Sequence, residues 1–248
     1  MPADLTGKRI IVTGTATGIG RSTMLRVSVN GAKVAAFDVN DAAGSATVGD
    51  ANEAGGNARF WHVDVRDETA VSGAVAAAET WLGGIDVLIH VAGVLQGAGV
   101  ALDEFPEEMW DTVLDINLRG SFTISKYVSG VMKKQRSGVI ILTASGAGVT
   151  GGSSSFAYGS SKGGVHGLAL VMEANLAQHG IRVNDVLPGS VATPLKVLNV
   201  KQMHEAGGGK GSLKEKIDAL VSPDDISKVY AFLASDEASM VKGSIRTQ

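Results

Sequence analysis

The chain has 248 residues, 44% of them hydrophobic, and a formal net charge of −3 at pH 7. This length can bury one sizeable core, and the slight acidity provides no electrostatic footprint for nucleic acid or an anionic membrane, so neither is expected as a partner. The absence of cysteine excludes disulfides, thiolate catalysis and cysteine metal sites.

Short apolar runs alternate with longer helical patterns along the chain. In chain order, these patterns predict a strand over residues 9–13, a helix over 19–29, strands over 33–37 and 59–63, a helix over 68–81, a strand over 87–91, a helix over 107–134, a strand over 139–143, a helix over 156–178 and a strand over 182–187. Most of the strands are continuously apolar, as in a parallel sheet covered on both faces. The sequence therefore predicts a single-domain α/β fold with a doubly wound sheet, whose ligands bind beyond the carboxyl ends of the strands.

The stretch over residues 165–172 is apolar nearly all round its predicted helix. A helix that packs only one face against a sheet needs an apolar stripe along that face alone, which is less apolar surface than this stretch carries. Two interpretations stay open: a helix deeply buried within one subunit, or a helix that packs partly against another subunit.

Three glycines lie where the first strand passes into the first helix. Gly14, Gly18 and Gly20 permit tight backbone angles there, and the free N–H groups of the helix favour a phosphate. Their Gly-x-x-x-Gly-x-Gly spacing differs from the standard dinucleotide fingerprint. A glycine-rich turn without a ligand is the alternative, but its position at the first strand-to-helix junction favours phosphate binding.

Acidic residues follow the second and third strands. Asp38 ends the second strand, where a carboxylate can bind both adenosine ribose hydroxyls and would repel a 2′-phosphate. Lys33 begins the second strand and Arg21 lies on a solvated helix face, so neither is positioned to bind a 2′-phosphate. NAD is therefore favoured over NADP. Asp64 follows the third strand and is expected either to bond the adenine amino group or to cap a helix or loop.

Tyr158 and Lys162 are four residues apart in the helix predicted over 156–178, so they share one face. A cation beside a phenol favours the phenolate and makes the tyrosine a candidate general acid or base. Ser145 ends the strand over 139–143, where its hydroxyl would face the ligand crevice. A surface pair and ordinary turn chemistry are the alternatives for these residues.

The sequence carries no recognisable targeting segment, membrane span or metal-binding motif. The five histidines show no close ligand pairing, so no metal is expected. Residues 1–8 lack a basic segment followed by an apolar run, and no apolar stretch approaches the ~20 residues of a membrane span. We expect a soluble, cytoplasmic protein.

With these motifs the chain resembles the classical short-chain dehydrogenase/reductase family over nearly its whole length. The matching elements come in the family's order: the turn from Thr13 to Gly20, Asp64 with Val65, Asn117, Ser145, Tyr158 with Lys162, and Pro188 and Gly189 followed by Thr193. The resemblance implies a Rossmann-like sheet of about seven strands, the last over 243–246, with helices on both faces.

The resemblance implies catalytic roles for Asn117, Ser145, Tyr158 and Lys162. Tyr158 would be the acid/base, Ser145 would hydrogen-bond the substrate oxygen, and Lys162 would hold the nicotinamide ribose. An ammonium at ~4 Å, at an effective dielectric near 20, supplies about 4 kcal/mol, enough to bring the pKa of Tyr158 close to neutrality. Asn117 would loosen its helix and hold a relay water through its backbone, with a merely tolerated polar residue as the alternative.

The cofactor that the resemblance implies is NAD. The segment after the sixth strand would pack on the nicotinamide and bond its carboxamide. The residues expected to contact the cofactor are Gly14, Thr17, Gly18, Ile19, Gly20, Asp38, Asp64, Val65, Ala92, Gly93, Tyr158, Lys162, Pro188, Gly189, Val191 and Thr193.

Two departures from the family pattern are visible. Where the family has Asn-Asn-Ala-Gly after the fourth strand, this chain has His90, Val91, Ala92 and Gly93. The lost amides normally brace the sheet and the cofactor edge; His90 is either a substitute donor or, as we expect, a satisfied structural histidine. The chain also stops at Gln248 without the family's Asp-Gly-Gly ending.

The sequence therefore predicts an NAD-dependent oxidoreductase that interconverts a secondary alcohol and a ketone. An NAD-binding sensor or scaffold with little turnover is the alternative; an epimerase or dehydratase is disfavoured because those relatives carry an extra domain. The segment over 193–220, with glycines at 207–211, reads as a mobile loop and a short helix over the pocket. The resemblance implies that it is a lid, and a disordered surface loop is the alternative. An apolar pocket is expected from Val94, Leu95, Gln96, Val149 and Val197, and a dimer or homotetramer through the helices over 107–134 and 156–178.

Overall fold

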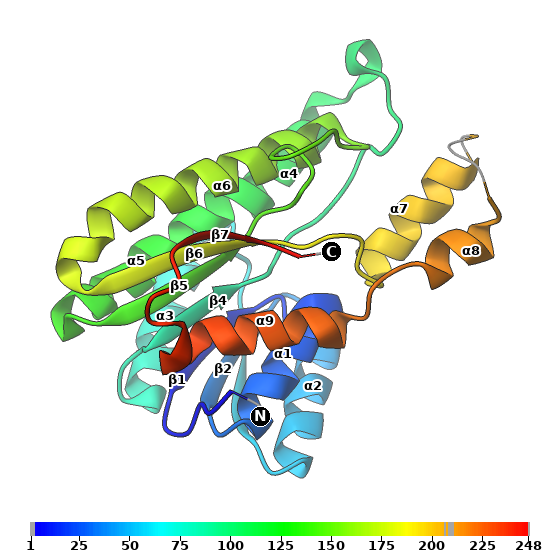
Figure 1. Ribbon diagram of the computed structural model, residues 1–248. Helices are drawn as coiled ribbons and strands as arrows, with labels where there is room; N and C mark the ends of the chain where they lie inside the picture. Colours follow the sequence, from blue (N-terminus) through cyan, green and yellow to red (C-terminus); the bar gives the residue numbers. More distant parts are fainter. Residues whose placement is uncertain (1–2, 206, 208–210, 248) are drawn as a thin grey trace.

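The computed structural model describes residues 3–205, 207 and 211–247. In this part of the chain, seven parallel strands form one sheet in the order β3-β2-β1-β4-β5-β6-β7 (Figure 1). The strands are β1 (Arg9–Thr13), β2 (Lys33–Asp38), β3 (Asn57–His62), β4 (Val87–His90), β5 (Gly138–Thr143), β6 (Ile181–Leu187) and β7 (Gly243–Arg246). The predicted doubly wound fold is confirmed, and the strand order reverses between β1 and β4, where such sheets bind ligands.

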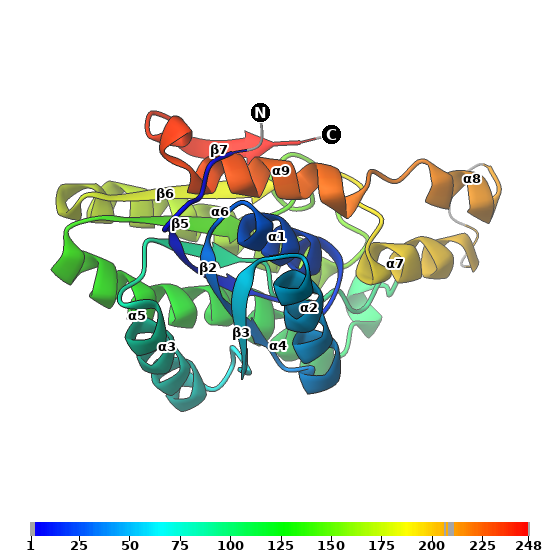
Figure 2. The same ribbon diagram turned by 90° about the horizontal axis from the view of Figure 1, so that it is seen from below.

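Helices cover both faces of the sheet (Figure 2). On one face, α1 (Gly18–Val29), α2 (Asp41–Glu53) and α9 (Pro223–Ala234) pack on an apolar cluster that includes Met24, Val34 and Tyr230. On the other face, α3 (Glu68–Leu82), α5 (Gly120–Gln135) and α6 (Phe156–Leu176) pack on a second cluster. The strands are buried on both sides, which explains why most of them read as continuous apolar runs.

Two of these helices were not predicted from the sequence. Few large apolar residues mark α2, which buries only Gly44, Thr47 and Ala51, so its periodicity is weak. By contrast, α9 carries a recognisable start signal, because Ser222 caps the helix and Pro223 occupies its first turn. Its apolar face is the signal that could have revealed it.

The helix predicted over 107–134 is interrupted. It consists of α4 (Glu107–Leu114), a π-helical turn over Asp115–Arg119, and α5. Asn117 lies in the π-helical turn, a local widening that is often found at functional sites. Short 3-10 turns cover Leu102–Glu104, Ala177–His179 and Asp236–Ala238.

The apolar helix α6 is buried along one side only. Val165 and Ala169 lie in the core, whereas the side chains of Leu170 and Val171 are 46% and 61% exposed. Deep burial within one subunit is therefore the wrong interpretation for these two residues.

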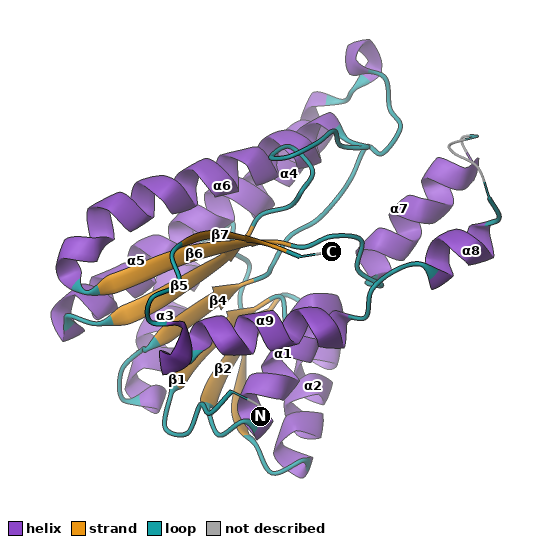
Figure 3. Cartoon of the chain, in the orientation of Figure 1, coloured by secondary structure: helices purple, strands orange, loops and turns teal. Residues whose placement is uncertain are grey.

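Two further helices stand beyond the carboxyl ends of the strands (Figure 3). They are α7 (Pro194–Glu205) and α8 (Leu213–Asp218), in the segment predicted as a lid or loop. Residues 208–210 of its glycine-rich part lie outside the described residues. Along the part of the chain that is described, every helix is too short or too polar to cross a membrane.

Candidate active site

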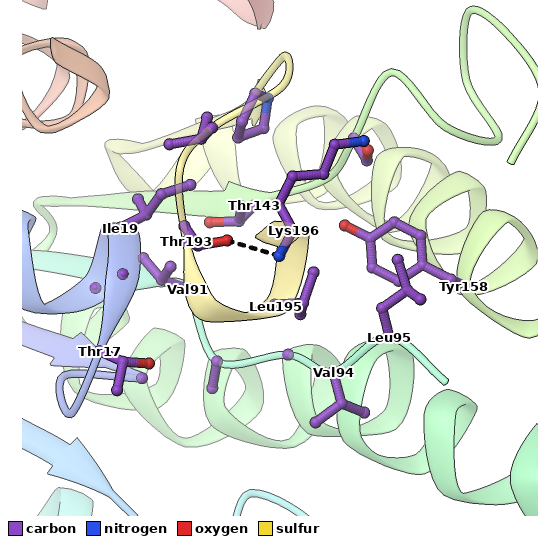
Figure 4. Close-up of a pocket in the computed structure, with 18 of the residues that line it drawn as sticks. Thr17, Ile19, Val91, Val94, Leu95, Thr143, Tyr158, Thr193, Leu195 and Lys196 are labelled. Atoms are coloured by element: carbon purple, nitrogen blue, oxygen red, sulfur yellow. Dashed lines mark hydrogen bonds between the residues drawn. The ribbon is translucent and has the colours of Figure 1, made fainter. Parts of the chain in front are cut away.

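A cavity of about 960 Å³ opens beyond the carboxyl ends of the central strands (Figure 4). Its walls come from the first strand-to-helix turn, the loops after β2 to β6, and helices α6, α7 and α8. Every residue predicted to bind the cofactor lines this cavity, as do Ser145, Tyr158 and Lys162. Of the predicted catalytic and cofactor-binding residues, only Asn117 lies behind the wall.

The glycine turn is packed too tightly for any side chain at two positions. A Cβ atom on Gly20 would lie 1.9 Å from the carbonyl oxygen of Gly14, and one on Gly14 would lie 2.8 Å from the backbone nitrogen of Ala92. Thr17, the residue before α1, makes no side-chain cap hydrogen bond to the helix. The backbone N–H groups of the first turn are therefore available for an anionic group, and this cradle fits the phosphates of a dinucleotide.

The carboxylate of Asp38 is held in place by two backbone N–H groups. Its Oδ2 accepts from Ala16 at 2.8 Å, and its Oδ1 accepts from Asn40 at 2.9 Å. Asp64 also lines the cavity, but Arg66 binds it in a salt bridge of 2.6 Å. Hydrogen bonding from Arg66 holds the pKa of Asp64 below its usual value. Each carboxylate is thus fixed in orientation at the cavity edge.

Tyr158 and Lys162 lie on one face of α6, as predicted. Ser155 caps this helix by accepting the Tyr158 N–H at 3.2 Å, which sets the first turn and the tyrosine with it. Lys162 is 4% exposed, and its Nζ donates to the carbonyl oxygen of Thr143 at 2.7 Å. Burial lowers the pKa of Lys162 to about 8.

The prediction that Lys162 lowers the pKa of Tyr158 is wrong when only the protein's own groups act on the phenol. Burial raises the pKa of Tyr158, and hydrogen bonding with Ser145 lowers it by less. The reason is geometric: Lys162 Nζ is directed at the Thr143 carbonyl and lies 5.8 Å from the centre of the tyrosine ring. A phenolate here needs a positive charge that the side chains themselves do not place at the hydroxyl.

Asn117 acts as a brace behind the cavity wall. Its side chain accepts from Val94 N–H at 2.8 Å and donates to the Val94 carbonyl at 2.9 Å and to Ser161 Oγ at 2.9 Å. Its own carbonyl accepts from Ser121 Oγ at 2.6 Å. The side chain therefore joins the loop after β4 to helix α6, three residues from Tyr158.

His90 is 1% exposed and has a defined tautomer. Its Nδ1 lies 2.8 Å from Thr13 Oγ1, and this hydroxyl already accepts from the N–H groups of Val91 and Ala92, at 3.1 and 3.2 Å. Since both lone pairs of the hydroxyl are in use, its proton goes to Nδ1, and the imidazole carries its hydrogen on Nε2.

Only one of the two imidazole nitrogens is satisfied. Within the described residues, His90 Nε2 has no hydrogen-bond partner, so the expectation of a fully satisfied histidine is wrong for this atom. Burial, together with the charge of Lys162, lowers the pKa of His90 to about 3. The loop after β4 is therefore braced by a neutral imidazole and a threonine instead of by amides.

The expected apolar wall is only partly correct. Val94 and Leu95 line the cavity, but Gln96, Val149 and Val197 do not. Gln96 points to solvent and Val149 packs against the core cluster. On α7 the lining residues are Leu195, Lys196, Asn199, Val200 and Met203, which share one face of the helix and leave Val197 on another. The sequence indicates a short helix in this segment but not its bounds, so it does not show which residues share this face.

Among the described residues, no three His, Asp or Glu side chains gather in a way that could hold a metal ion.

The sequence was compared with known families and proteins. A family model described as short chain dehydrogenase matches residues 8–204. The chain is 38% identical over 242 residues to (+)-borneol dehydrogenase 1 of Salvia officinalis, covering 96% of this chain and 91% of the relative.

Solved structures share the fold at nearly full length. The crystal structure of levodione reductase superposes with a TM-score of 0.91 at 30% identity, covering 98% of this chain and 96% of that one. The crystal structure of NAD+-bound xylitol dehydrogenase superposes with a TM-score of 0.90 at 32% identity, covering 98% of each chain.

Proposed function

Since this chain belongs to the short-chain dehydrogenase family, whose members are oxidoreductases that act on alcohols, we propose that it interconverts a secondary alcohol and a ketone with NAD(H). One observation carries the proposal: Ser145, Tyr158 and Lys162 line the same cavity as a glycine cradle suited to phosphates. The cavity thus combines a proton-transfer group with a place for a dinucleotide.

Each residue of the catalytic set has a role that its position supports. In the direction of oxidation, Tyr158 accepts the proton of the substrate hydroxyl, and Ser145 hydrogen-bonds the same oxygen. Lys162 Nζ donates to the Thr143 carbonyl and lies 5.8 Å from the centre of the Tyr158 ring, and the other N–H groups of its ammonium would bind ribose hydroxyls. The nicotinamide supplies the hydride acceptor and a positive charge near the phenol when bound. Asn117 positions the loop and α6, and a relay water on its carbonyl would share that oxygen with Ser121.

NAD is the cofactor that the adenosine end of the cavity favours. Asp38 presents a fixed carboxylate, which would accept hydrogen bonds from the adenosine ribose hydroxyls and repel a 2′-phosphate. The basic residues nearby are engaged elsewhere: Arg21 pairs with Asp50, Arg66 pairs with Asp64, and Lys33 donates to the carbonyl of Trp81. The NAD+-bound relative agrees with this choice.

The substrate pocket favours a bulky or cyclic alcohol or ketone. Val94, Leu95 and Leu195 contribute apolar surface to the cavity that Tyr158 also lines (Figure 4). Names of relatives point the same way, since borneol and levodione are ring compounds. The segment over 193–220, within a single cofactor-binding domain, forms the lid of this pocket through α7 and α8.

The protein assembles as a dimer or homotetramer in our proposal. The helices over 107–134 and 156–178 carry exposed apolar side chains that suit subunit contacts, including Phe122 on α5 and Leu170 and Val171 on α6. A cytoplasmic location remains a prediction from the sequence.

The test is a screen of NADH absorbance over secondary alcohols and ketones, with Tyr158→Phe as the control. We expect turnover that Tyr158→Phe abolishes while NAD binding persists. NAD binding without turnover of any compound in the panel would favour a sensor or scaffold instead. A better rate with NADP than with NAD would contradict the role given to Asp38.

A further inference from the structure

The substrate end of the cavity contains an unpaired cation. Lys196 lines the cavity from the first turn of α7 and is half-buried. Within the described residues, its Nζ has no hydrogen bond or ion pair, and burial lowers the pKa of Lys196. A half-buried ammonium without a partner bears part of the cost of desolvation, which a bound anion would offset.

The stability of α7 does not explain a lysine at this position. A cation in the first turn of a helix lies at the positive end of the helix dipole, which is unfavourable. Lys201 on the same helix is exposed and does not line the cavity. Formation of α7 therefore does not by itself place a lysine in the cavity wall.

Two contacts hold Lys196 in place over the cavity. Thr193 Oγ1 accepts the backbone N–H of Lys196 at 3.1 Å and caps the helix. One turn further on, Asn199 Nδ2 donates to Ser154 Oγ at 2.9 Å and ties α7 to the opposite wall. Figure 4 shows the Lys196 side chain extending from α7 toward the side of the cavity where Tyr158 lies, away from Thr17 and the phosphate cradle.

The charge around Lys196 selects the kind of group it would bind. The carboxylates of the described lining, Asp38 and Asp64, both lie at the adenosine end. At the substrate end the lining instead contains two further lysines. Lys162 Nζ donates to the Thr143 carbonyl, and Lys216 Nζ lies 3.3 Å from His204 Nδ1. No arginine lines this end in the described part of the chain, so a doubly charged phosphate would lack the bidentate donors it prefers.

We propose that the substrate carries a single carboxylate besides its carbinol or carbonyl group, and that Lys196 Nζ binds this carboxylate. The inference rests on the proposed alcohol–ketone oxidoreductase activity and names its substrate class, hydroxy acids and oxo acids. In reduction, hydride passes from NADH to the carbonyl carbon and Tyr158 gives its proton to the oxygen, while the carboxylate is unchanged and fixes the orientation of the substrate.

The experiment compares acids with their matched primary amides. Para-acetylbenzoate, meta-acetylbenzoate and a linear oxo acid are each paired with the amide, and binding is measured by calorimetry with and without NADH. The variants are Lys196→Met, Lys196→Arg as the charge-retaining form, and Lys201→Met as the matched control on the exposed side of α7.

We expect the wild type to bind at least one acid more tightly than its amide. Lys196→Met should weaken that acid by about 10- to 100-fold and its amide by less than about 3-fold, Lys196→Arg should restore part of the loss, and Lys201→Met should change neither. The inference is overturned if no acid of the panel is bound better than its amide. It is also overturned if Lys196→Met weakens NADH by the same factor as the acid, because Lys196 would then serve the cofactor pyrophosphate.

Hydride transfer is scored separately from binding. If the preference for acids depends on Lys196 but no ketone is reduced, the proposed oxidoreductase function fails while carboxylate binding stands. If neutral ketones are reduced and acids are not preferred, the oxidoreductase function stands and this inference fails.

Discussion

Replacing His90 with asparagine should make the fold less sensitive to acid. The pKa of His90 is lowered to about 3 by burial and by the charge of Lys162, whereas a histidine in an unfolded chain titrates near 6.5. Between these values the unfolded chain binds a proton at His90 that the folded protein does not. Stability is therefore full above the unfolded pKa and is lost as the pH falls through it.

The size of this effect follows from the two pKa values. In the window between them the free energy of unfolding changes by about 1.4 kcal/mol per pH unit. Between about pH 7.5 and about pH 5, His90 alone should cost about 2 kcal/mol of stability, because the folded imidazole stays neutral throughout this interval.

The assay is urea unfolding of the wild type and of His90→Asn at both pH values. The loss of unfolding free energy on acidification should be about 2 kcal/mol smaller in the variant, whatever the variant costs at the higher pH. His62→Asn, at a side chain that is 59% exposed, controls for the removal of one histidine. Equal losses in the wild type and His90→Asn would mean that folded His90 takes up a proton, and both the neutral state and the tautomer inferred here would be wrong.

Three further outcomes are expected. Tyr158→Phe should lower kcat by about 100- to 10,000-fold with NAD affinity changed less than about 3-fold, which NADH absorbance and calorimetry measure; turnover at a tenth of the wild-type rate would exclude Tyr158 as the acid/base. Gly20→Ala should weaken NAD binding by about 10-fold or more, because its Cβ would lie 1.9 Å from the Gly14 carbonyl oxygen, whereas Gly49→Ala, with nothing within 4 Å, should not; similar affinities in calorimetry would contradict the cradle. Asp38→Asn should reduce the preference for NAD over NADP by about 10-fold in kcat/KM, and an unchanged ratio would show that Asp38 does not select the cofactor.

Much of the scaffold and of the cavity lining could be predicted from the sequence. Strands buried on both faces are continuous apolar runs, and this pattern can be recognised in a single segment without knowing which segments it packs against. The glycine turn and the helical spacing of Tyr158 and Lys162 are likewise local, so the sequence alone predicts these groups at one edge of the sheet.

The orientation and charge state of the site residues were decided only by the tertiary structure. Lys162 follows Tyr158 at the expected spacing on α6, but its ammonium donates to the Thr143 carbonyl at the end of β5, so burial dominates the pKa of Tyr158. Likewise, the tautomer of His90 depends on Thr13, 77 residues away, whose hydroxyl is already used by two backbone N–H groups.

Lys196 shows the same contrast between what is local in the sequence and what tertiary contacts decide. Its first-turn position on α7 is local, but its inward placement depends on the bond between Asn199 and Ser154, which joins segments 45 residues apart. Sequence periodicity determines which residues share a face of one element, because that spacing is a property of the backbone. What the face meets, and therefore its solvation, charge and hydrogen bonds, depends on segments distant in the chain, and these contacts arise only on folding.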